Sequence, residues 1–249
     1  IPVITTMMGI SVFPDDDQLF CGMIGTHGVK MANAAVNECD VLFLVGARVG
    51  DRAVKTPLAL EKTTKIIHID PAEIGKNIGA DLPLVGDAKL VLQQMTELAK
   101  PMKHDEWIAH IKTLGGERKY VEPAKGTVNP RVFIDRLAKK MPANVTVVAD
   151  VGQNQIWTCT EYKFRKEGRL LTSGGMGTMG YSVPAAIGAK MADDSRATVA
   201  ICGDGAFQMS FMELATAVQF GVDIKVVVMT NNRLGMVREL QTNGYHDRQ

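Results

Sequence analysis

The sequence predicts an α/β fold made of two doubly wound, mostly parallel-sheet domains. Short apolar runs alternate with helix-like segments along the chain, and the runs are continuous instead of alternating in polarity. Continuous runs are typical of strands that helices cover on both faces of a parallel sheet. The length of 249 residues suffices for two ordinary domains.

The first domain is expected at residues 1–105, followed by a linker at 106–127. Its predicted strands are residues 2–6, 41–47, 65–70 and 82–87, and its predicted helices are 29–38 and 88–100. The stretch 101–125 is polar and interrupted by Gly and Pro, which indicates a connector with some helix.

The second domain is expected at residues 128–249. Its first helix should begin at Pro130, with Asn129 as the N-cap. The predicted strands are 145–151, 169–173, 197–202 and 224–230, and the predicted helices are 182–192 and 210–220. In the last of these helices, one apolar stripe is expected to form from Phe211, Leu214, Ala215 and Val218.

Composition argues against several classes of function. The net charge is +1, so neither nucleic acid nor a membrane surface is an expected partner. No apolar run approaches the ~20 residues that a membrane span needs. The cysteines (Cys21, Cys39, Cys159 and Cys202) lack metal-like spacing and are expected to be reduced thiols. A cytoplasmic location is expected; because the chain begins at Ile1, organelle targeting stays open.

A Gly-Asp-Gly turn, Gly203 to Gly205, follows the apolar run at 197–202. The next helix and strand complete a βαβ unit, whose right-handed crossover brings both strand ends to one sheet edge. That edge is where open α/β sheets bind ligands. Asn231 ends the second strand, 25 residues after Gly205, so Asp204 and Asn231 are expected to be neighbours in space.

One carboxylate and one amide oxygen at such an edge suit Mg²⁺, which usually takes only one or two protein carboxylates among about six oxygens. The glycines let the backbone approach a phosphate closely. This unit is therefore interpreted as a metal–diphosphate anchor. A plain tight turn is the alternative interpretation, and the turn alone would favour it.

Gly-Asp-Gly followed by Asn231-Asn232 resembles the signature of thiamine-diphosphate enzymes. The segments 149–157 and 172–190 are similar to that family's diphosphate-contacting and aminopyrimidine-cradling segments. In the first domain, residues 22–28, 45–52 and 67–78 resemble the central, FAD-binding domain of the acetolactate synthase large subunits. The resemblance covers nearly the whole chain.

The resemblance implies the cofactors thiamine diphosphate, Mg²⁺ and FAD. The metal ligands would be Asp204, Asn231 and the backbone carbonyl of Arg233. The thiamine-diphosphate positions would be Gln153, Asn154, Gly177, Met179, Gly203, Asp204, Gly205, Ala206, Asn231 and Met236. Gly177 and Met179 carry catalytic roles in the resemblance: the Gly177 carbonyl accepts from the aminopyrimidine, and Met179 bends the cofactor beneath its thiazolium ring.

The FAD positions implied are Gly25, His27, Gly46, Ala47, Arg48, Arg52, Asp70, Gly86 and Asp87. Structural alternatives exist for several positions. His27 could be a hydrogen-bonded loop histidine, Met179 a core methionine, and the two arginines members of surface ion pairs. Leu240 stands where anabolic synthases usually carry Trp, and it is expected to line the acceptor end of the site.

The resemblance implies a carboligase that condenses two pyruvates to 2-acetolactate with loss of CO₂, or pyruvate with 2-oxobutanoate, in branched-chain amino acid biosynthesis. Expected partners are a second copy of the chain, a regulatory small subunit and small 2-oxo acids. The chain would be a fragment, inactive alone, because the family's glutamate-bearing N-terminal domain and C-terminal lid are not found in it.

Two alternatives stay open. One is another thiamine-diphosphate enzyme: a pyruvate oxidase, a glyoxylate carboligase or a 2-oxo-acid decarboxylase. The other is a non-catalytic nucleotide-binding module, because Gly175, Gly177 and Gly180 match the spacing G-x-G-x-x-G. Against that module, no acidic residue placed to face a ribose follows about 20 residues later.

Overall fold

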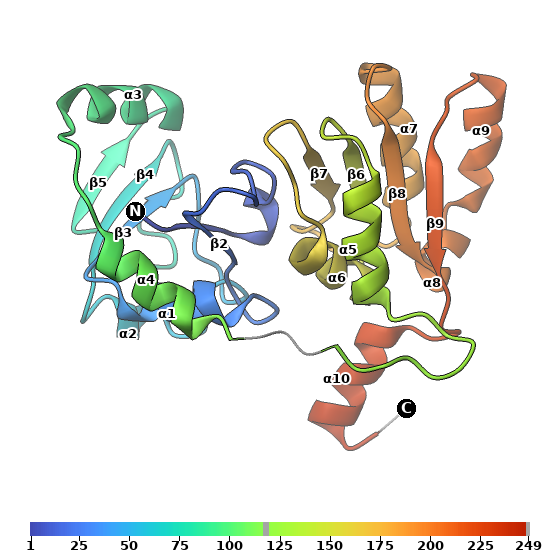
Figure 1. The fold of residues 1–249 in the computed structure, drawn as a ribbon, viewed down its shortest axis with the longest axis horizontal. Coiled ribbons are helices and arrows are strands. Elements are labelled where there is room, and N and C mark those ends of the chain that lie inside the picture. The colour runs from blue at the N-terminus through green and yellow to red at the C-terminus, as the bar shows by residue number, and fades with distance from the viewer. Residues whose placement is uncertain (117–119, 248–249) are drawn as a thin grey trace. The chain divides into compact units, whose positions relative to one another are not determined.

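The computed structural model describes residues 1–116 and 120–247 and divides the chain into two compact units (Figure 1). Unit 1 contains Ile1–Thr6 and Leu19–Glu117. Unit 2 contains Met7–Gln18 and Arg118–Gln249. A short N-terminal segment, Met7–Gln18, therefore belongs to the second unit although it lies between two parts of the first.

Unit 1 is built on parallel strands. β1 (Val3–Thr5) pairs with β2 (Phe20–Met23), and a second sheet has the order β3-β4-β5. The bounds of that sheet are β3 Val41–Val45, β4 Lys65–Asp70 and β5 Leu82–Val85. The helices are α1 Lys30–Glu38, α2 Pro57–Leu60, α3 Ala88–Leu98 and α4 Asp105–Leu114. A buried apolar cluster that includes Val36, Leu44 and Ile66 joins α1 to β3 and β4.

Unit 2 is a four-stranded parallel sheet in the order β7-β6-β8-β9. The strands are β6 Thr146–Ala149, β7 Arg169–Thr172, β8 Thr198–Gly203 and β9 Lys225–Met229. The α-helices are α5 Pro130–Lys140, α6 Gln153–Glu161, α7 Ser182–Ala192, α8 Asp204–Gln208, α9 Leu214–Gln219 and α10 Gly235–Tyr245. Two 3₁₀ turns complete the unit, η1 Met7–Gly9 and η2 Phe211–Glu213.

The strand order of unit 2 creates a topological switch point. From β6 the chain passes to β7 on one side, and it then returns across β6 to β8 and β9 on the other. Right-handed crossovers in opposite directions place α6 and α7 on opposite faces of the sheet. A crevice therefore opens at the carboxyl ends of β6 and β8, which is where such sheets bind ligands.

The centre of this sheet is fully apolar. Val147, Val148 and Ala200 are completely buried, which explains why the central strands are continuous apolar runs. On the face that α7 covers, the core combines Val148 and Ala200 with Ala186 of the helix. A second cluster joins Val183 of α7 to Ala217 of α9.

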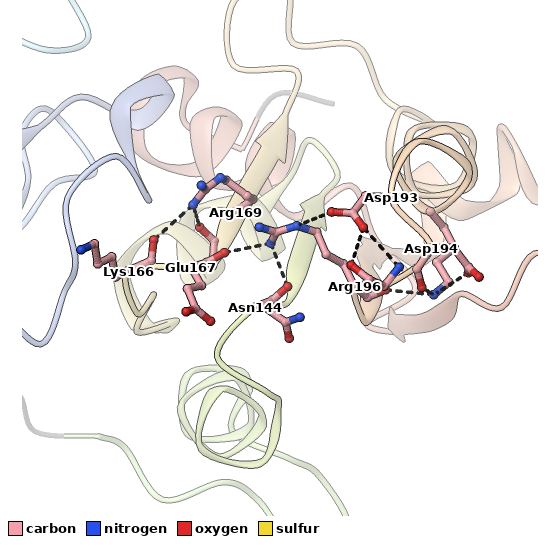
Figure 2. A network of polar contacts seen from close by, with 10 residues as sticks. Asn144, Lys166, Glu167, Arg169, Asp193, Asp194 and Arg196 are labelled. Carbon is pink, nitrogen blue, oxygen red and sulfur yellow. Dashed lines mark hydrogen bonds and ion pairs between the residues drawn. The ribbon is translucent and has the colours of Figure 1, made fainter. Parts of the chain in front are cut away.

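The amino edge of the sheet is tied by Arg196 (Figure 2). Its Nη1 donates to the carbonyls of Asn144 and Glu167, both at 2.8 Å, and its Nε donates to Asp193 at 3.0 Å. These partners precede β6, β7 and β8 respectively. Arg196 therefore joins three loops at the edge opposite the crevice.

The segment Met7–Gln18 packs along the outer side of β7. The backbone N–H of Leu170 donates to Oγ of Ser11 at 2.9 Å, which satisfies an edge-strand donor. Asp15 and Phe164 exchange two further bonds, Asp15 N–H to the Phe164 carbonyl and Phe164 N–H to Oδ2 of Asp15. Burial raises the pKa of Asp15 to about 6, and the bond from Phe164 opposes that rise.

The structure confirms the predicted α/β class with parallel sheets. It also confirms the helix start at Pro130, because the Asn129 side chain accepts from the N–H groups of Arg131 and Val132. All four cysteines are free thiols. Elements that were not predicted include β2, α2 and α6.

Of the stripe predicted in the helix at 210–220, Leu214 packs against the buried cluster that includes Ala217, but Phe211, Ala215 and Val218 are exposed. Phe211 and Val218 are 51% and 82% exposed, and the buried residue is Ala217. The reason is that the segment is not one helix: η2 covers its first residues and α9 begins only at Leu214. A 3₁₀ turn has about three residues per turn, so the face predicted from a continuous α-helix is not the face that packs.

Candidate functional site

A cavity of about 120 Å³ lies in unit 2 at the carboxyl ends of its strands. Four segments line it, one after each strand. They are residues 151–154 after β6, Met179 after β7, residues 203–206 at the end of β8, and Met229, Asn231 and residues 233–237 around the end of β9. Trp157 of α6 also lines the cavity. The cavity therefore occupies the switch point.

Asp204 connects the ends of β8 and β9 at this cavity. Its Oδ2 accepts from the backbone N–H groups of Asn231, at 3.1 Å, and Asn232, at 2.6 Å. Its Oδ1 accepts from the N–H of Gly205 at 2.9 Å. The structure thus brings together the two residues that the crossover argument placed at one edge.

The loop after β9 presents oxygen atoms next to Asp204. Oδ1 of Asn231 accepts from the N–H of Arg233 at 3.0 Å, so this side chain folds over the turn. Asn232 has a φ of 55°, a left-handed conformation that is uncommon outside glycine. The turn keeps Asn231 and Arg233 on the cavity wall.

The glycine turn after β8 leaves no room for a side chain. A Cβ at Gly205 would lie 2.6 Å from Cδ2 of Leu234 and 3.6 Å from Cε of Met179. Gly203 and Ala206 also line the cavity. Leu234 therefore fills the space that a side chain at Gly205 would need, and Gly205 contributes only backbone to the cavity lining.

Gln153 and Asn154 occupy different environments. The Gln153 side chain lies against Gly235, where a Cβ would come within 2.0 Å of its Oε1, and its Nε2 donates to Glu239 of α10 at 3.3 Å. Asn154 is buried, and its Nδ2 donates to the carbonyls of Asp150 and Ile201. The side chain of Asn154 therefore bridges the ends of β6 and β8.

Gly177 and Met179 lie in the loop between β7 and α7. Gly177 has a φ of 67° and donates to the carbonyl of Ser173 at 2.9 Å, and Thr178 N–H donates to Oγ of Ser173. Of the two predicted residues, Met179 lines the cavity and Gly177 does not. The side chain of Met179 reaches the Gly205 turn from across the crevice.

The helix α10 carries Met236 and Leu240 on one side. Met236 lines the cavity, whereas Leu240 lies one turn further on, is 61% exposed, and is not part of the lining. None of the described side chains of α10 is buried, so the helix is attached at its start, where Gln153 contacts Gly235 and Glu239.

Three of the predicted FAD positions meet at one edge of unit 1. Gly46, Asp70 and Gly86 stand at the ends of the adjacent strands β3, β4 and β5. Gly46 N–H donates to the Ile69 carbonyl, and Gly86 N–H to the Asp70 carbonyl. The N–H groups of Ala72 and Glu73 donate to Oδ1 of Asp70 and hold its pKa below its usual range.

The other predicted FAD positions lie on loops around the same unit. Gly25 is packed so tightly that a Cβ would lie 2.2 Å from the Arg52 carbonyl, and Thr26 N–H donates to that carbonyl. The Arg48 carbonyl accepts from Nδ2 of Asn77. Asp87 caps α3 by accepting from Leu90 N–H. His27 is an exposed loop residue, and Ala47 is a half-buried one.

Cys202 lies in β8, directly before the Gly203–Gly205 turn. Burial raises its pKa to about 11, Ser182 opposes that rise, and the charge of Asp150 adds to it. The thiol is therefore neutral near pH 7 and unsuited to metal binding. In the described parts of the chain, no three His, Cys, Asp or Glu side chains gather as a metal cluster. A metal at Asp204 would need amide, carbonyl and phosphate oxygens.

The G-x-G-x-x-G match, Gly175 to Gly180, does lie between a strand and a helix, β7 and α7. However, the acidic residue at the end of the following strand, Asp204, is bonded to the loop after β9. Asp204 is therefore not placed to bind a ribose hydroxyl, as the acidic residue of a dinucleotide site does.

Sequence reasoning missed several cavity residues. Trp157 and Leu234 line the cavity, and Glu239 holds Gln153. The signal for Trp157 was available, since it lies four residues after Gln153, one turn along the unpredicted helix α6. The contact of Glu239 depends on the orientation of α10, which no sequence pattern specifies.

Residues 150–249, which contain the whole cavity, match the family model "Thiamine pyrophosphate enzyme, C-terminal TPP binding domain". Residues 1–95 match the family model "Thiamine pyrophosphate enzyme, central domain". The chain belongs to the thiamine pyrophosphate enzyme family. Within this family, curated relatives resemble the whole chain.

Three such relatives are the acetolactate synthase large subunits of Lactococcus lactis (37% identical) and Corynebacterium glutamicum (40%) and the acetolactate synthase of Mycobacterium avium (39%). Each alignment covers all of this thiamine pyrophosphate enzyme chain and 44%, 41% and 42% of the relative, respectively. The chain thus spans less than half the length of the relatives it matches. Within the described residues, no helix combines the length and hydropathy that a membrane crossing requires.

Proposed function

We propose that the cavity of unit 2 binds thiamine diphosphate through Mg²⁺, and that the assembled enzyme forms 2-acetolactate from two pyruvates with release of CO₂. Pyruvate with 2-oxobutanoate would be the second substrate pair. The observation that carries the proposal is the bonding of Asp204 to the 231–232 turn beside the side-chain-free wall at Gly205. The similarity to acetolactate synthases over the whole chain supports the choice of reaction.

Mg²⁺ would be held by the Asp204 carboxylate, the Asn231 side-chain oxygen and the Arg233 carbonyl. All three residues line the same cavity. The set contains one carboxylate, which leaves the remaining positions of an octahedral ion for phosphate oxygens and water. A site with a single protein charge suits a metal that arrives together with a diphosphate.

The diphosphate would lie on the backbone of Gly203, Gly205 and Ala206, with Gln153 and Asn154 on the other side. Support comes from Gly205, where a side chain would collide with Leu234, and from Gly235, where it would collide with Gln153. Leu234 and Gln153 thus fill the space beside these glycines, and the glycine turn after β8 would bring backbone N–H groups close to the phosphate.

Bound thiamine diphosphate supplies an electron sink for the carbanion left when a 2-oxo acid loses CO₂. The chain supplies position. Met179 and Met236 would hold the cofactor from the two sides of the cavity, and the Gly177 carbonyl would accept from its aminopyrimidine. Fixing the cofactor's reacting atoms in this way lowers the entropy that the reaction must lose.

FAD is proposed for unit 1, at the edge formed by Gly46, Asp70 and Gly86. The ends of three adjacent parallel strands support this placement, because that edge is the usual ligand edge. Asp70 keeps Oδ2 for a ribose hydroxyl, since Oδ1 accepts from Ala72 and Glu73.

The exposed apolar face of η2 and α9 supports a second copy of the chain as partner. Phe211, Val218 and Phe220 are each more than half exposed, and such faces mark interaction sites. We also propose a regulatory small subunit as a partner and a cytoplasmic location. The proposed domain limits are 1–105 and 128–249.

Calorimetric titration with thiamine diphosphate tests the proposal. Binding should saturate in millimolar Mg²⁺, weaken at least tenfold when a chelator removes the metal, and be weak for thiamine without the diphosphate. Equal binding with and without metal would contradict the anchor. Given pyruvate, the assembled enzyme should release 2-acetolactate; acetate or acetaldehyde as the main product would instead indicate one of the other thiamine-diphosphate enzymes.

A further inference from the structure

A buried carboxyl group beneath the cavity has no role in the proposed function. Asp150 follows β6 directly and is 0% exposed. No ion pair to Asp150 occurs among the described residues. A buried carboxylate without a cation is costly unless hydrogen bonds replace the lost water.

Three backbone N–H groups take the place of that water. Oδ1 of Asp150 accepts from Val151 at 2.8 Å and from Gly180 at 3.0 Å, and Oδ2 accepts from Ser182 at 2.8 Å. Ser182 is the first residue of the 11-residue helix α7, so the carboxylate also lies at the positive end of that helix dipole. Backbone N–H groups thus satisfy the carboxylate, one from the next residue and two from the other side of the crevice.

These bonds fix one end of the loop between β7 and α7. The other end is held by Ser173, whose Oγ accepts from Thr178 N–H. Gly180 has a φ of 84°, and a Cβ there would lie 3.0 Å from Cβ of Met209, so this end of the loop is also tightly packed. The position of Gly180 is therefore set by contacts on both sides.

Met179 immediately precedes Gly180 and is the loop residue that lines the cavity. Its Cε approaches the Gly205 turn, where a Cβ would lie 3.6 Å away. A displacement of Gly180 moves the backbone that carries this side chain. The depth of Met179 in the cavity consequently depends on the bonds that Asp150 accepts.

We infer that Asp150 is a positioning residue: by holding the N–H groups of Gly180 and Ser182, it sets where Met179 stands against the bound thiamine diphosphate. This inference rests on the proposed function, because it concerns the same cavity. It assigns to Asp150 an effect on cofactor binding that acts through Met179 and differs from general support of the fold.

The test compares Asp150→Asn, Met179→Ala and the double variant, with Arg196→Lys as control. The amide in Asp150→Asn keeps one acceptor oxygen. Its NH₂ group replaces the other oxygen and faces a backbone N–H group, so a hydrogen bond is lost there. Arg196→Lys weakens the same unit at the opposite sheet edge, so it reports the effect of lost stability alone. Thiamine diphosphate affinity is read from the fluorescence of Trp157, which lines the cavity.

Each single variant should weaken binding about tenfold, and the double variant should be no more than about threefold weaker than either, because both act on one contact. Amide hydrogen exchange of residues 173–182 without cofactor should speed up in Asp150→Asn and stay unchanged in Arg196→Lys. If Asp150→Asn does not fold, Asp150→Ser, which keeps one acceptor oxygen, should give the same order of effects.

Two results would overturn the inference: losses that multiply to about a hundredfold in the double variant, or an Asp150→Asn protein that binds and exchanges like Arg196→Lys. A wild-type protein that binds no thiamine diphosphate would refute the proposed function, and the inference with it. Wild-type binding with unaltered Asp150→Asn affinity refutes the inference alone.

Discussion

Asp204 and Asn231 are 27 positions apart in the chain, yet Oδ2 of Asp204 accepts a hydrogen bond from the backbone N–H of Asn231 at 3.1 Å. The bond joins the ends of two adjacent parallel strands, β8 and β9. It exists because the crossover through α8 and α9 returns the chain to the same sheet edge. This pairing places the carboxylate of Asp204 in the cavity wall, where it joins the ends of the two strands.

Gly25→Ala should destabilise unit 1 by more than about 2 kcal/mol, because a Cβ would collide with the Arg52 carbonyl and the φ of 116° disfavours any side chain. Gly46→Ala is the matched control: its φ is also positive, but no atom lies within 4 Å, so about 1 kcal/mol is expected. Urea unfolding followed by Trp107 fluorescence measures both. Equal losses would show that the close contact at Gly25 is relieved at no cost.

Arg196→Ala should lower the free energy of unfolding of unit 2 by about 1–3 kcal/mol, because two loop carbonyls and Asp193 lose their donor. Thiamine diphosphate affinity should not change, since the network lies at the amino edge of the sheet. Arg136→Ala, an exposed arginine of α5, should stay within about 0.5 kcal/mol. Thermal unfolding measures the stability of both variants, and an equal loss in Arg196→Ala and Arg136→Ala would contradict the prediction.

The sequence predicted most of the sheet because a parallel strand is a continuous apolar run, and eight strands can be found by that criterion alone. β2 was missed because it is only four residues long and Gly22 interrupts its apolar run. α6 was missed for a different reason. Five of its nine residues are buried polar side chains, Asn154, Gln155, Thr158, Thr160 and Glu161, and a buried polar face has no hydrophobic periodicity.

The contacts of the site also divide into those that the sequence can predict and those that it cannot. The pairing of Asp204 with the 231–232 turn follows from crossover geometry and could be predicted. The bonds of Asp150 to Gly180 and Ser182 could not, because they cross between loops whose conformations depend on positive-φ glycines and on α7. Residues that contact one another across a crevice are visible only in the folded chain.

Asp15→Asn should stabilise unit 2 at pH 8 relative to wild type and lose that advantage below pH 4. Burial raises the pKa of Asp15 from 3.8 to about 6, so the folded state holds a proton that the unfolded state has released between these values. Wild-type stability therefore falls as pH rises through this window, by up to about 1–3 kcal/mol. Urea unfolding of both proteins at several pH values gives the difference; a difference that is constant from pH 4 to 8 would contradict the raised pKa.

Leu240→Trp should raise the preference of the assembled enzyme for 2-oxobutanoate over pyruvate by a factor on the order of tens, because a large flat side chain packs an additional methylene better than leucine does. Leu240 lies one turn beyond the cavity residue Met236 and is 61% exposed, which leaves space for the larger ring. A competition assay with both 2-oxo acids measures the product ratio, with Thr242→Trp on another face of α10 as control. An unchanged ratio would remove Leu240 from the acceptor end of the site.

The most direct measurement of the central claim is the Mg²⁺ dependence of thiamine diphosphate binding in Asp204→Asn. The amide keeps the size of the side chain and can still accept from Asn231, but it removes the charge that would hold the metal. We expect the affinity in Mg²⁺ to fall at least tenfold, to the value that wild type shows in chelator, while Asp194→Asn at the opposite edge binds as wild type does. Metal-dependent binding that is as tight in Asp204→Asn as in wild type would contradict the assignment of this cavity as the metal–diphosphate site.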